Sequence, residues 1–595
     1  MGGRLGCDAN SLMHHARNSR TTKRREDGTT IPRLRIASGR GEFVGRKREV
    51  AVLRASVKQA IRGHGGIVLL SGEAGIGKTR TAERAATFAR NCSAWVCSAR
   101  GWEGDGAPPF WPWAQVIRTY AREHDPNQVA VQMGQGIGDI VRFMPELREL
   151  LPDTRIPRTS AELEPDEVRF RVFESVVTFL KNAGEQEPIV IVFDDLHWAD
   201  KPSLVLLAYL AGEIQTSRLL IVATYRDWEV DAPNDLSHTV AELARHRWTQ
   251  HIALQGLTEG DIGRFVASVS DGAAADLATV LYDKTEGNPL FLTELVRLLS
   301  TEGRLNDLES GRYAAAMIPQ TVRGVIRKRL EALSDETASI LEIASVLGRE
   351  FELAVVEAVS RCHTDSIIKM IDEARAARIV SNVPDKRGYF RFLHVLMRDT
   401  IVESLGASRC RDLHNAVGVA IEERYTSRID AYASVLSYHF FQGISVGNEK
   451  KAIEYSLVAA EGAAASLAYE EAALYYRRAL EVLGHHLQDR AARCRILLSL
   501  GDVLQKGGEC GGARAIFLQA GVLARAIGAV DEFGVAAIGF KGILSITDPV
   551  DEEAVAFLRE ALDMLGTSDC ALRVRLLSEL AMSLYFACDS TESET

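Results

Sequence analysis

The sequence predicts an α/β domain with a parallel sheet, followed by a winged-helix region and an α-solenoid of repeated helices. Three observations lead to this order. Short apolar runs alternate with helical patterns up to about residue 256, a helical stretch then ends in a single hairpin, and small residues finally recur at a fixed interval. The chain has 595 residues, which is enough for about three to five domains of ordinary size.

We expect five parts. They are a disordered basic tail (1–40), an α/β core (41–256), a helical lid (257–317), a winged-helix region (318–425) and helical repeats that end early (426–595). Nine Lys or Arg and three Asp or Glu give residues 1–40 a charge of +6. Because the net charge of the whole chain is −10, the remaining residues carry a charge of −16. An acidic body argues against broad nucleic-acid binding, because DNA and RNA phosphates need a cationic face.

No apolar run is long enough to cross a bilayer, and the N-terminus has no apolar secretory segment. We therefore expect a cytoplasmic protein that does not enter a membrane.

Five apolar runs are expected to form buried strands of one sheet. Helix-like segments separate them, for example at 166–180, and such alternation indicates parallel strands covered by helices on both faces. The five runs are 67–70, 94–97, 189–193, 219–223 and 251–254.

Beyond residue 258 the pattern is helical. Short helices continue from about residue 318, and a hairpin is expected between strands at 378–382 and 388–393, joined by VPDKRG. Helices followed by such a hairpin indicate a winged helix.

The last third contains four columns of matching residues that are 41 positions apart. Small residues with one large residue between them indicate stacked helical pairs of tetratricopeptide type. The interval of 41 residues is longer than the usual repeat of about 34, so we expect longer helices or loops. The chain stops after the first helix of a fourth pair, so we expect a truncated array or a helix supplied by a partner. The columns are Ala472/Ala513/Ala554, Ala479/Ala520/Ala561, Tyr476/Phe517/Leu558 and Ala460/Gly501/Gly542.

A glycine-rich loop, GEAGIGKT, follows the first predicted strand and precedes a helix. Gly72, Gly75 and Gly77 let the backbone curl so that its N–H groups face phosphate oxygens. In this pattern Lys78 reaches the β- and γ-phosphates and the Thr79 hydroxyl ligates Mg²⁺. The loop therefore predicts a P-loop that binds ATP or ADP with Mg²⁺.

Charged residues follow two of the later strands, at the edge where open parallel sheets bind ligands. Asp194 is the expected Mg²⁺ ligand, and Asp195 could polarise the attacking water, although a helix-capping role is the alternative. Arg226 could stabilise the γ-phosphate or form an ordinary surface ion pair.

The segment GWEGDGAPPFWPW holds three tryptophans among Gly and Pro. We interpret it as a loop pinned by aromatic burial, and a ligand platform is the alternative.

With these motifs in place, the chain resembles the signal-transduction ATPases with numerous domains (STAND). The most similar branch is that of the large ATP-binding LuxR-family regulators, in which an AAA core of the origin-recognition type precedes a winged helix and tetratricopeptide-like repeats. The resemblance rests on FVGRKREVAVL, GWEGDGAPPFWPWAQVIR, FDDLHWADKPSL, TEGNPLFLTEL, IPQTVRGVIRKRL, IASVLGREF and FRFLHVLMRDTIVESL. It covers about residue 42 to the C-terminus.

The resemblance implies further site residues. It places Val44 and Arg46 near the nucleotide base and has Pro289 pack against that base. It also brings His394 to the diphosphate in a closed state, with a plain core histidine as the alternative.

What the resemblance implies is a slow, Mg²⁺-dependent ATPase that works as a switch and scaffold in bacterial regulation. ADP would hold the winged helix shut, and a protein partner or inducer on the repeats would favour exchange for ATP, opening and self-assembly. No C-terminal helix-turn-helix is visible, which makes direct DNA binding by this chain doubtful. The alternatives are an initiator-type AAA ATPase that acts on DNA, a transcription regulator that has lost its helix-turn-helix, and a metabolic kinase or transferase.

Overall fold

A computed structural model describes most of the chain. The described residues run from 43 to 588, except 103–107, 153–164, 228–233, 270–274, 302–320, 384–385, 445–447, 485–488, 543–550 and 568–569. The expected tail at 1–40 lies outside them. Within the described part, no helix combines the length and the apolar character that a membrane span requires.

Five parallel strands form one sheet in the order β2-β3-β4-β1-β5, which confirms the predicted sheet. The expectation that all five strands are buried is wrong at the edges. The edge strand β5 is only partly covered and exposes His251, and the other edge strand, β2, exposes Ser98. The strands are β1 Gly66–Ser71, β2 Trp95–Arg100, β3 Ile189–Asp194, β4 Leu219–Thr224 and β5 Thr249–Ala253.

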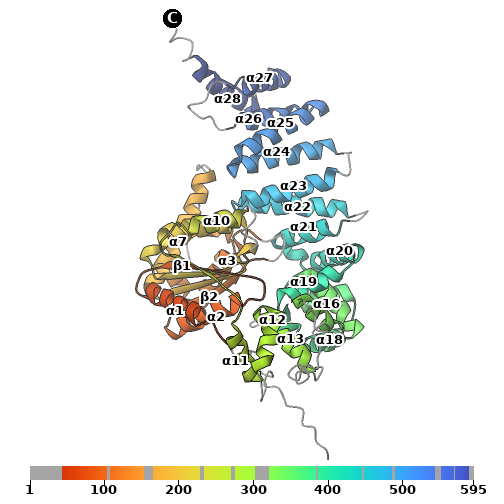
Figure 1. Cartoon of the computed structure of the whole chain (residues 1–595). Helices are drawn as coiled ribbons and strands as arrows, with labels where there is room; N and C mark the ends of the chain where they lie inside the picture. The colour runs from red at the N-terminus through yellow and green to blue at the C-terminus, as the bar shows by residue number, and fades with distance from the viewer. Residues whose placement is uncertain are drawn as a thin grey trace, which may run out of the picture.

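Helices cover both faces of this sheet, as Figure 1 shows. Side chains alternate along β1, so Val68 and Leu70 pack under α1 and α2, whereas Ile67 and Leu69 face α3, α7 and α8. The helices are α1 Lys47–Ile61, α2 Lys78–Asn91, α3 Trp111–Glu123, α4 Pro126–Met133, α5 Ile137–Phe143, α6 Leu147–Leu150, α7 Pro165–Gln186, α8 Lys201–Glu213 and α10 Asp235–Leu243.

Three helices follow the sheet and share a small hydrophobic core to which Val325 also contributes: α11 Glu259–Val269, α12 Ala275–Thr285 and α13 Pro289–Thr301. We call residues 257–301 the lid segment. The start of α13 lies beside the glycine-rich loop, because the Leu290 amide donates to the Gly75 carbonyl at 3.3 Å.

A second sheet lies in residues 321–425, which we call the hairpin region. Its strands β7 Val380–Asn382 and β8 Tyr389–Phe392 pair antiparallel, as expected, and β6 Glu350–Glu352 adds a third strand that the sequence does not reveal. A three-residue strand offers too little alternation to be recognised. The helices are α15 Val322–Leu330, α16 Asp335–Leu347, α17 Leu353–Ser360, α18 Thr364–Ala376, α19 Val395–Ser404 and α20 Ala407–Arg424.

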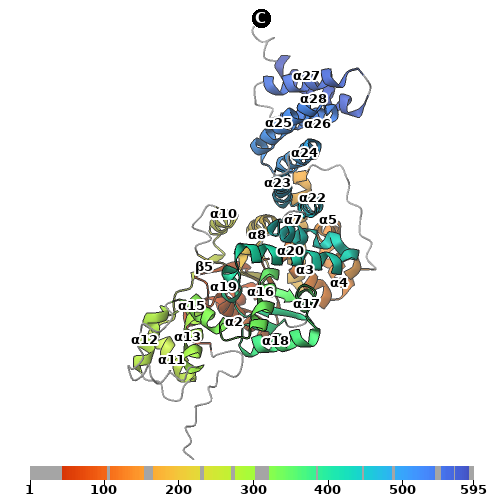
Figure 2. The same cartoon turned by 90° about the vertical axis from the view of Figure 1, so that its right-hand side faces the viewer.

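Antiparallel helices then stack into an arm that leads away from the sheet domain (Figures 1 and 2). We call this arm the solenoid. It comprises the short η6 Thr426–Tyr432 and the helices α21 Ala433–Gln442, α22 Glu449–Ala465, α23 Tyr469–Gly484, α24 Arg490–Lys506, α25 Cys510–Ile527, α26 Val530–Lys541, α27 Glu552–Leu565 and α28 Ala571–Cys588.

The predicted repeat columns fall on equivalent helices. The first three columns lie on α23, α25 and α27, and every member is buried. The fourth column is wrong at its end, because Gly542 terminates α26 with φ of 66° instead of lying in a helix crossing. Gly539 occupies the crossing there, against the ring of Phe517.

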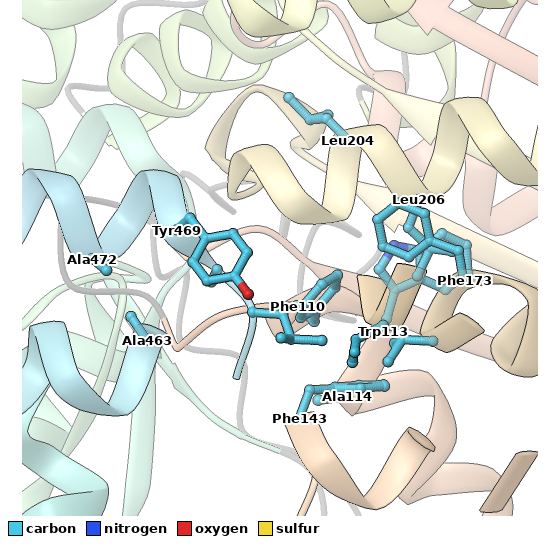
Figure 3. Packing of buried hydrophobic residues seen from close by; sticks show 14 of the residues in the cluster. Phe110, Trp113, Ala114, Phe143, Phe173, Leu204, Leu206, Ala463, Tyr469 and Ala472 are labelled. Carbon is cyan, nitrogen blue, oxygen red and sulfur yellow. The ribbon is translucent and has the colours of Figure 1, made fainter. Parts of the chain in front are cut away.

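The solenoid packs on the sheet domain through one continuous hydrophobic cluster. Figure 3 shows Tyr469 of the solenoid beside Phe110 of the sheet domain, and Ala463 and Phe143 belong to the same cluster. Phe110 and Trp113 are fully buried, so the Trp-rich segment is pinned at this point. The first solenoid helices therefore share a core with the α/β domain.

Two helix-interior glycines test the packing of the solenoid. An added Cβ at Gly501 would lie 2.8 Å from the ring of Phe517, whereas Gly462 has nothing within 4 Å. Alanine favours a helix over glycine by about 1 kcal/mol. We expect Gly462→Ala to raise the thermal unfolding midpoint and Gly501→Ala to lower it. Equal midpoint shifts in calorimetry would contradict the tight crossing at Phe517.

Candidate nucleotide site

The glycine-rich loop joins β1 to α2 in a conformation that needs its glycines. Gly72, Gly75 and Gly77 have φ of 144°, 82° and 100°, which side chains rarely tolerate. Lys78 folds back over the loop, and its Nζ donates to the carbonyls of Gly72 (2.6 Å) and Glu73 (2.9 Å). The loop is thus a preformed cradle at the N-terminus of α2, a favourable place for phosphate.

The two expected Mg²⁺ ligands are in direct contact. The Thr79 hydroxyl lies 2.8 Å and 3.1 Å from the two carboxylate oxygens of Asp194. The Thr224 hydroxyl also donates to Asp194, at 2.7 Å. Hydroxyl and carboxylate oxygens are the donors that Mg²⁺ takes from proteins, so these residues fit the ion.

Two arginines that the sequence analysis does not single out hold the carboxylates. Arg100 ends β2, which pairs with β3 so that Arg100 is opposite Asp194, and the two side chains form an ion pair. Arg349 lies between α16 and β6 in the hairpin region, and its Nη1 is 3.2 Å from Oδ2 of Asp195. Only a resemblance in the surrounding motif, IASVLGREF, could have drawn attention to Arg349.

The pKa values of the neighbouring carboxylates Asp194 and Asp195 are shifted in opposite directions. Burial opposes the ionisation of Asp194, but Arg100, the Thr224 hydroxyl and Arg349 together hold its pKa below the usual range. Burial, and then the charge of Asp194, raise the pKa of Asp195. A raised pKa makes Asp195 the better proton acceptor of the two.

A cavity of about 350 Å³ opens in front of the loop. Its walls come from the sheet domain, the lid segment and the hairpin region. Of the predicted site residues, Gly75, Gly77, Lys78, Thr79, Asp195, Arg226, Pro289 and His394 line it, whereas Gly72 and Asp194 do not.

The residues expected near the nucleotide base line a second, smaller hollow that shares Pro289 with the cavity. Val44, Arg46 and Pro289 line a hollow of about 50 Å³ together with Ile76. Arg46 is buried, and its guanidinium donates to the Ile76 carbonyl at 3.1 Å. The lid segment is tied to the loop here, because the Asn288 amide donates to the Ala74 carbonyl at 3.0 Å.

His394 caps the N-terminus of α19, and its Nδ1 accepts a hydrogen bond from the Leu396 amide at 3.3 Å. Burial, and then the charges of Arg349, Arg226 and Lys78, lower its pKa to about 3. The ring is therefore neutral near pH 7, with its proton on Nε2.

Comparisons with known proteins agree with this geometry. Residues 42–222 match the family described as AAA ATPase domain, and membership of this segment in that family implies that it binds a nucleotide.

Two curated relatives are distant. An uncharacterized protein of Rhizobium meliloti is 21% identical over 481 residues, which cover 77% of this chain and 44% of the relative. A peroxide stress-activated histidine kinase of Schizosaccharomyces pombe is 22% identical over 376 residues, 58% of this chain and 15% of the kinase. The chain thus spans less than half the length of either relative.

Similar solved structures include a STAND protein with a tetratricopeptide repeat sensor from Pyrococcus horikoshii. It is 17% identical, with a TM-score of 0.39 and coverage of 91% of this chain and 80% of that chain. Drosophila ORC bound to DNA is 12% identical, with a TM-score of 0.28 and coverage of 65% and 95%. A RuvB mutant of Thermotoga maritima is 13% identical, with a TM-score of 0.24 and coverage of 59% and 93%.

The site predicts that Lys78→Ala weakens ATP binding. The substitution removes the cation that faces the β- and γ-phosphates and leaves the backbone cradle in place. We expect ATP affinity to fall at least about tenfold, or about 1.4 kcal/mol, in calorimetry. Lys58→Ala, at an exposed position on α1, is the control and should not change affinity. Unchanged binding in Lys78→Ala would refute the site.

The low pKa of His394 predicts how acid affects stability. The unfolded imidazole takes up a proton near pH 6.5 and the folded one only near pH 3, so stability falls as pH falls between these values. His394→Asn retains a capping side chain but cannot titrate. Below pH 6.5 we expect the unfolding free energy of this variant to fall less steeply with pH than that of wild type. The two slopes should differ by up to about 1 kcal/mol per pH unit for this half-buried ring. Denaturant titrations at several pH values measure the slope, and parallel curves would contradict the assignment.

Proposed function

We propose that this chain is a STAND-class signalling switch, in which exchange of ADP for ATP releases the hairpin region from the AAA ATPase domain. One observation carries the proposal: Arg349 of the hairpin region forms an ion pair with Asp195, and both residues line the nucleotide cavity. A constitutive ATPase has no need to hold its water-positioning carboxylate with a cation from another part of the chain. A switch needs a contact of this kind, because the contact must break when the nucleotide changes.

The residues of the site suggest their roles in hydrolysis. Lys78 and the N-terminus of α2 would hold the phosphates, and Thr79 with Asp194 would hold Mg²⁺, which supplies charge neutralisation when it is bound. Asp195 would orient the attacking water and accept its proton. Arg226, on the wall of the same cavity, would stabilise charge at the γ-phosphate.

The proposed closed state keeps hydrolysis slow. While Arg349 holds Asp195, that carboxylate is less available to water. His394 lines the same cavity, and its Nε2–H could donate to a diphosphate oxygen. ADP would then join three parts of the chain: the P-loop, the lid segment and the hairpin region.

We further propose that the hairpin region is a winged helix, that the lid segment is the AAA lid, and that the solenoid receives the signal as a binding surface for a protein partner or inducer. Opening would expose surfaces for self-assembly. The acidic body of the chain gives no support to the alternative of an ATPase that acts on DNA.

Arg349→Gln tests the proposal. It removes the charge that the hairpin region contributes to Asp195, leaves Arg100 of the sheet domain 3.8 Å from that carboxylate, and nearly retains the length of the side chain. We expect ADP to dissociate at least about tenfold faster, or about 1.4 kcal/mol. Small-angle scattering should also show a larger radius of gyration in ADP than wild type has.

Arg387→Gln is the matched control, because Arg387 is exposed in the same region. It should leave both measurements unchanged. If Arg349→Gln is as compact as wild type in ADP and releases ADP at the same rate, then the ion pair does not hold a closed state and the proposal fails.

A further inference from the structure

We propose that a groove on the outer side of the sheet domain docks a short acidic segment of a partner protein. The groove measures about 550 Å³ and lies between α1 and α2, which Figure 1 shows side by side on one face of the sheet. It shares no lining residue with the nucleotide cavity, and it does not depend on the proposed switch. We call it the cationic groove after its charged residues, which are Lys47, Arg54, Lys58 and Arg84.

The charge of this surface is opposite to that of the chain around it. All four cations of the groove are exposed, and α1 as a whole has four Lys or Arg and a single Glu. Residues 41–595 together carry a charge of −16. A local concentration of cations on an acidic protein attracts a ligand whose negative charge is confined to that place.

The four cations are not neutralised by the residues around them. In the described part of the chain, no carboxylate lines the cationic groove and no ion pair involves its cations. The glutamates of the two helices face elsewhere. Glu49 lies 3.6 Å from the buried Arg46, and Glu83 lines the nucleotide cavity. The charge of the groove is therefore available to a ligand.

The spacing of the lining residues makes the groove a track along α1. Positions 47, 50, 51, 54, 55 and 58 lie on one face of the helix, because residues three and four apart are neighbours. The floor between the cations is small and apolar, with Val50, Ala51 and Ala55. The track is about 16 Å long, at 1.5 Å per residue. An extended peptide covers that length with about five residues, and its alternate side chains point the same way.

Aromatic rings position three of the four cations. The Arg84 guanidinium lies 4.6 Å from the ring centroid of Phe43. Arg54 and Lys58 lie 5.3 Å and 5.9 Å from the ring centroid of Phe88. A side chain that is already held in place loses less conformational freedom when a ligand pairs with it. The groove is thus better prepared for an anion than a set of unrestrained surface cations.

A protein segment fits the groove better than a nucleic-acid strand does. Single strands bind by stacking their bases on aromatic faces, but Phe43 and Phe88 each already have a cation over the ring. A long polyanion would also extend beyond the groove over an acidic body, which would repel it. A short segment in which acidic and small side chains alternate confines its charge to the cations and matches the apolar floor.

The position of the groove gives the docked partner a place in the molecule. Phe43 lines both the cationic groove and the hollow that is expected to receive the nucleotide base. A partner held in the groove would therefore lie next to the nucleotide. The groove would recruit a protein to the ATPase domain itself, at a surface distinct from the solenoid.

Binding is tested on the full chain by fluorescence anisotropy, with a labelled, end-capped heptapeptide of alternating glutamate and alanine. The matched probe has glutamine in place of each glutamate. We expect saturable binding of the acidic peptide, at least about tenfold tighter than that of the glutamine peptide, because each ion pair at an exposed surface contributes up to about 1 kcal/mol. Added salt should weaken this binding.

Two variants locate the binding. Arg54→Gln combined with Lys58→Gln should weaken it at least about fivefold, since two ion pairs are lost. Ala55→Glu retains all four cations but places a carboxylate on the floor, and it should weaken binding by a similar factor. The matched control is Arg245→Gln with Arg247→Gln, which makes the same change in net charge at exposed positions between α10 and β5. It should leave binding unchanged.

Three results would overturn the proposal. One is no saturable binding of the acidic peptide to wild type, and another is equal loss of binding in the groove variants and in the control, since net charge alone would then explain the affinity. The third is equal affinity for the glutamine peptide, which would remove the requirement for acidic side chains. A short DNA duplex serves as the competing ligand. If it binds more tightly than the peptide and loses affinity in the Arg54 and Lys58 variant, then the groove is a nucleic-acid site and the choice of a protein segment is wrong.

Discussion

The buried carboxylates at the end of β3 are the constraint on which the arrangement of this chain depends. A carboxylate such as Asp194 is costly to bury unless cations and hydroxyl donors surround it. The sheet domain supplies Arg100, Thr224 and Thr79 to Asp194, but Arg349, which pairs with the neighbouring Asp195, comes from the hairpin region about 150 residues further along the chain. Because the stabilising cations come from both parts of the chain, the ATPase domain and the hairpin region are coupled electrostatically. A bound Mg²⁺ would add positive charge at this place, and a γ-phosphate would compete with the carboxylates for the arginines.

A second contact ties the solenoid to the same domain. Glu471 of α23 accepts a hydrogen bond from the Lys201 amide at the start of α8, and Arg169 pairs with Glu470 at 3.2 Å. Burial, followed by the nearby Asp200, raises the pKa of Glu471 well above its usual range. These polar groups surround the apolar contact of Tyr469 with the sheet domain (Figure 3). Movement of α8, which directly follows the Asp194 loop, would therefore act on the first solenoid helices without an intervening linker.

The glycine-rich loop, by contrast, takes its backbone shape from its own sequence, although Arg46 and Asn288 also donate hydrogen bonds to its carbonyls. Its three positive φ values and the return of Lys78 to the loop carbonyls are set by local sequence. For this reason the glycine-rich loop and the five strands could be predicted from periodicity and one short motif. The hairpin strands and three of the four repeat columns were predictable in the same way, since each depends on a pattern within a short segment.

The sequence by itself determined the elements and the local chemistry: the parallel sheet, the phosphate loop, the acidic residues after β3 and the small-residue columns of the solenoid. Only the tertiary structure decided which distant residues meet. The pairing of Arg349 with Asp195, the neutral state of His394, the partial exposure of β5 and the displacement of Gly542 from its column all depend on packing between segments. The physical reason is that periodicity records which side of an element is buried, whereas charge pairing and desolvation depend on what another part of the chain places against it.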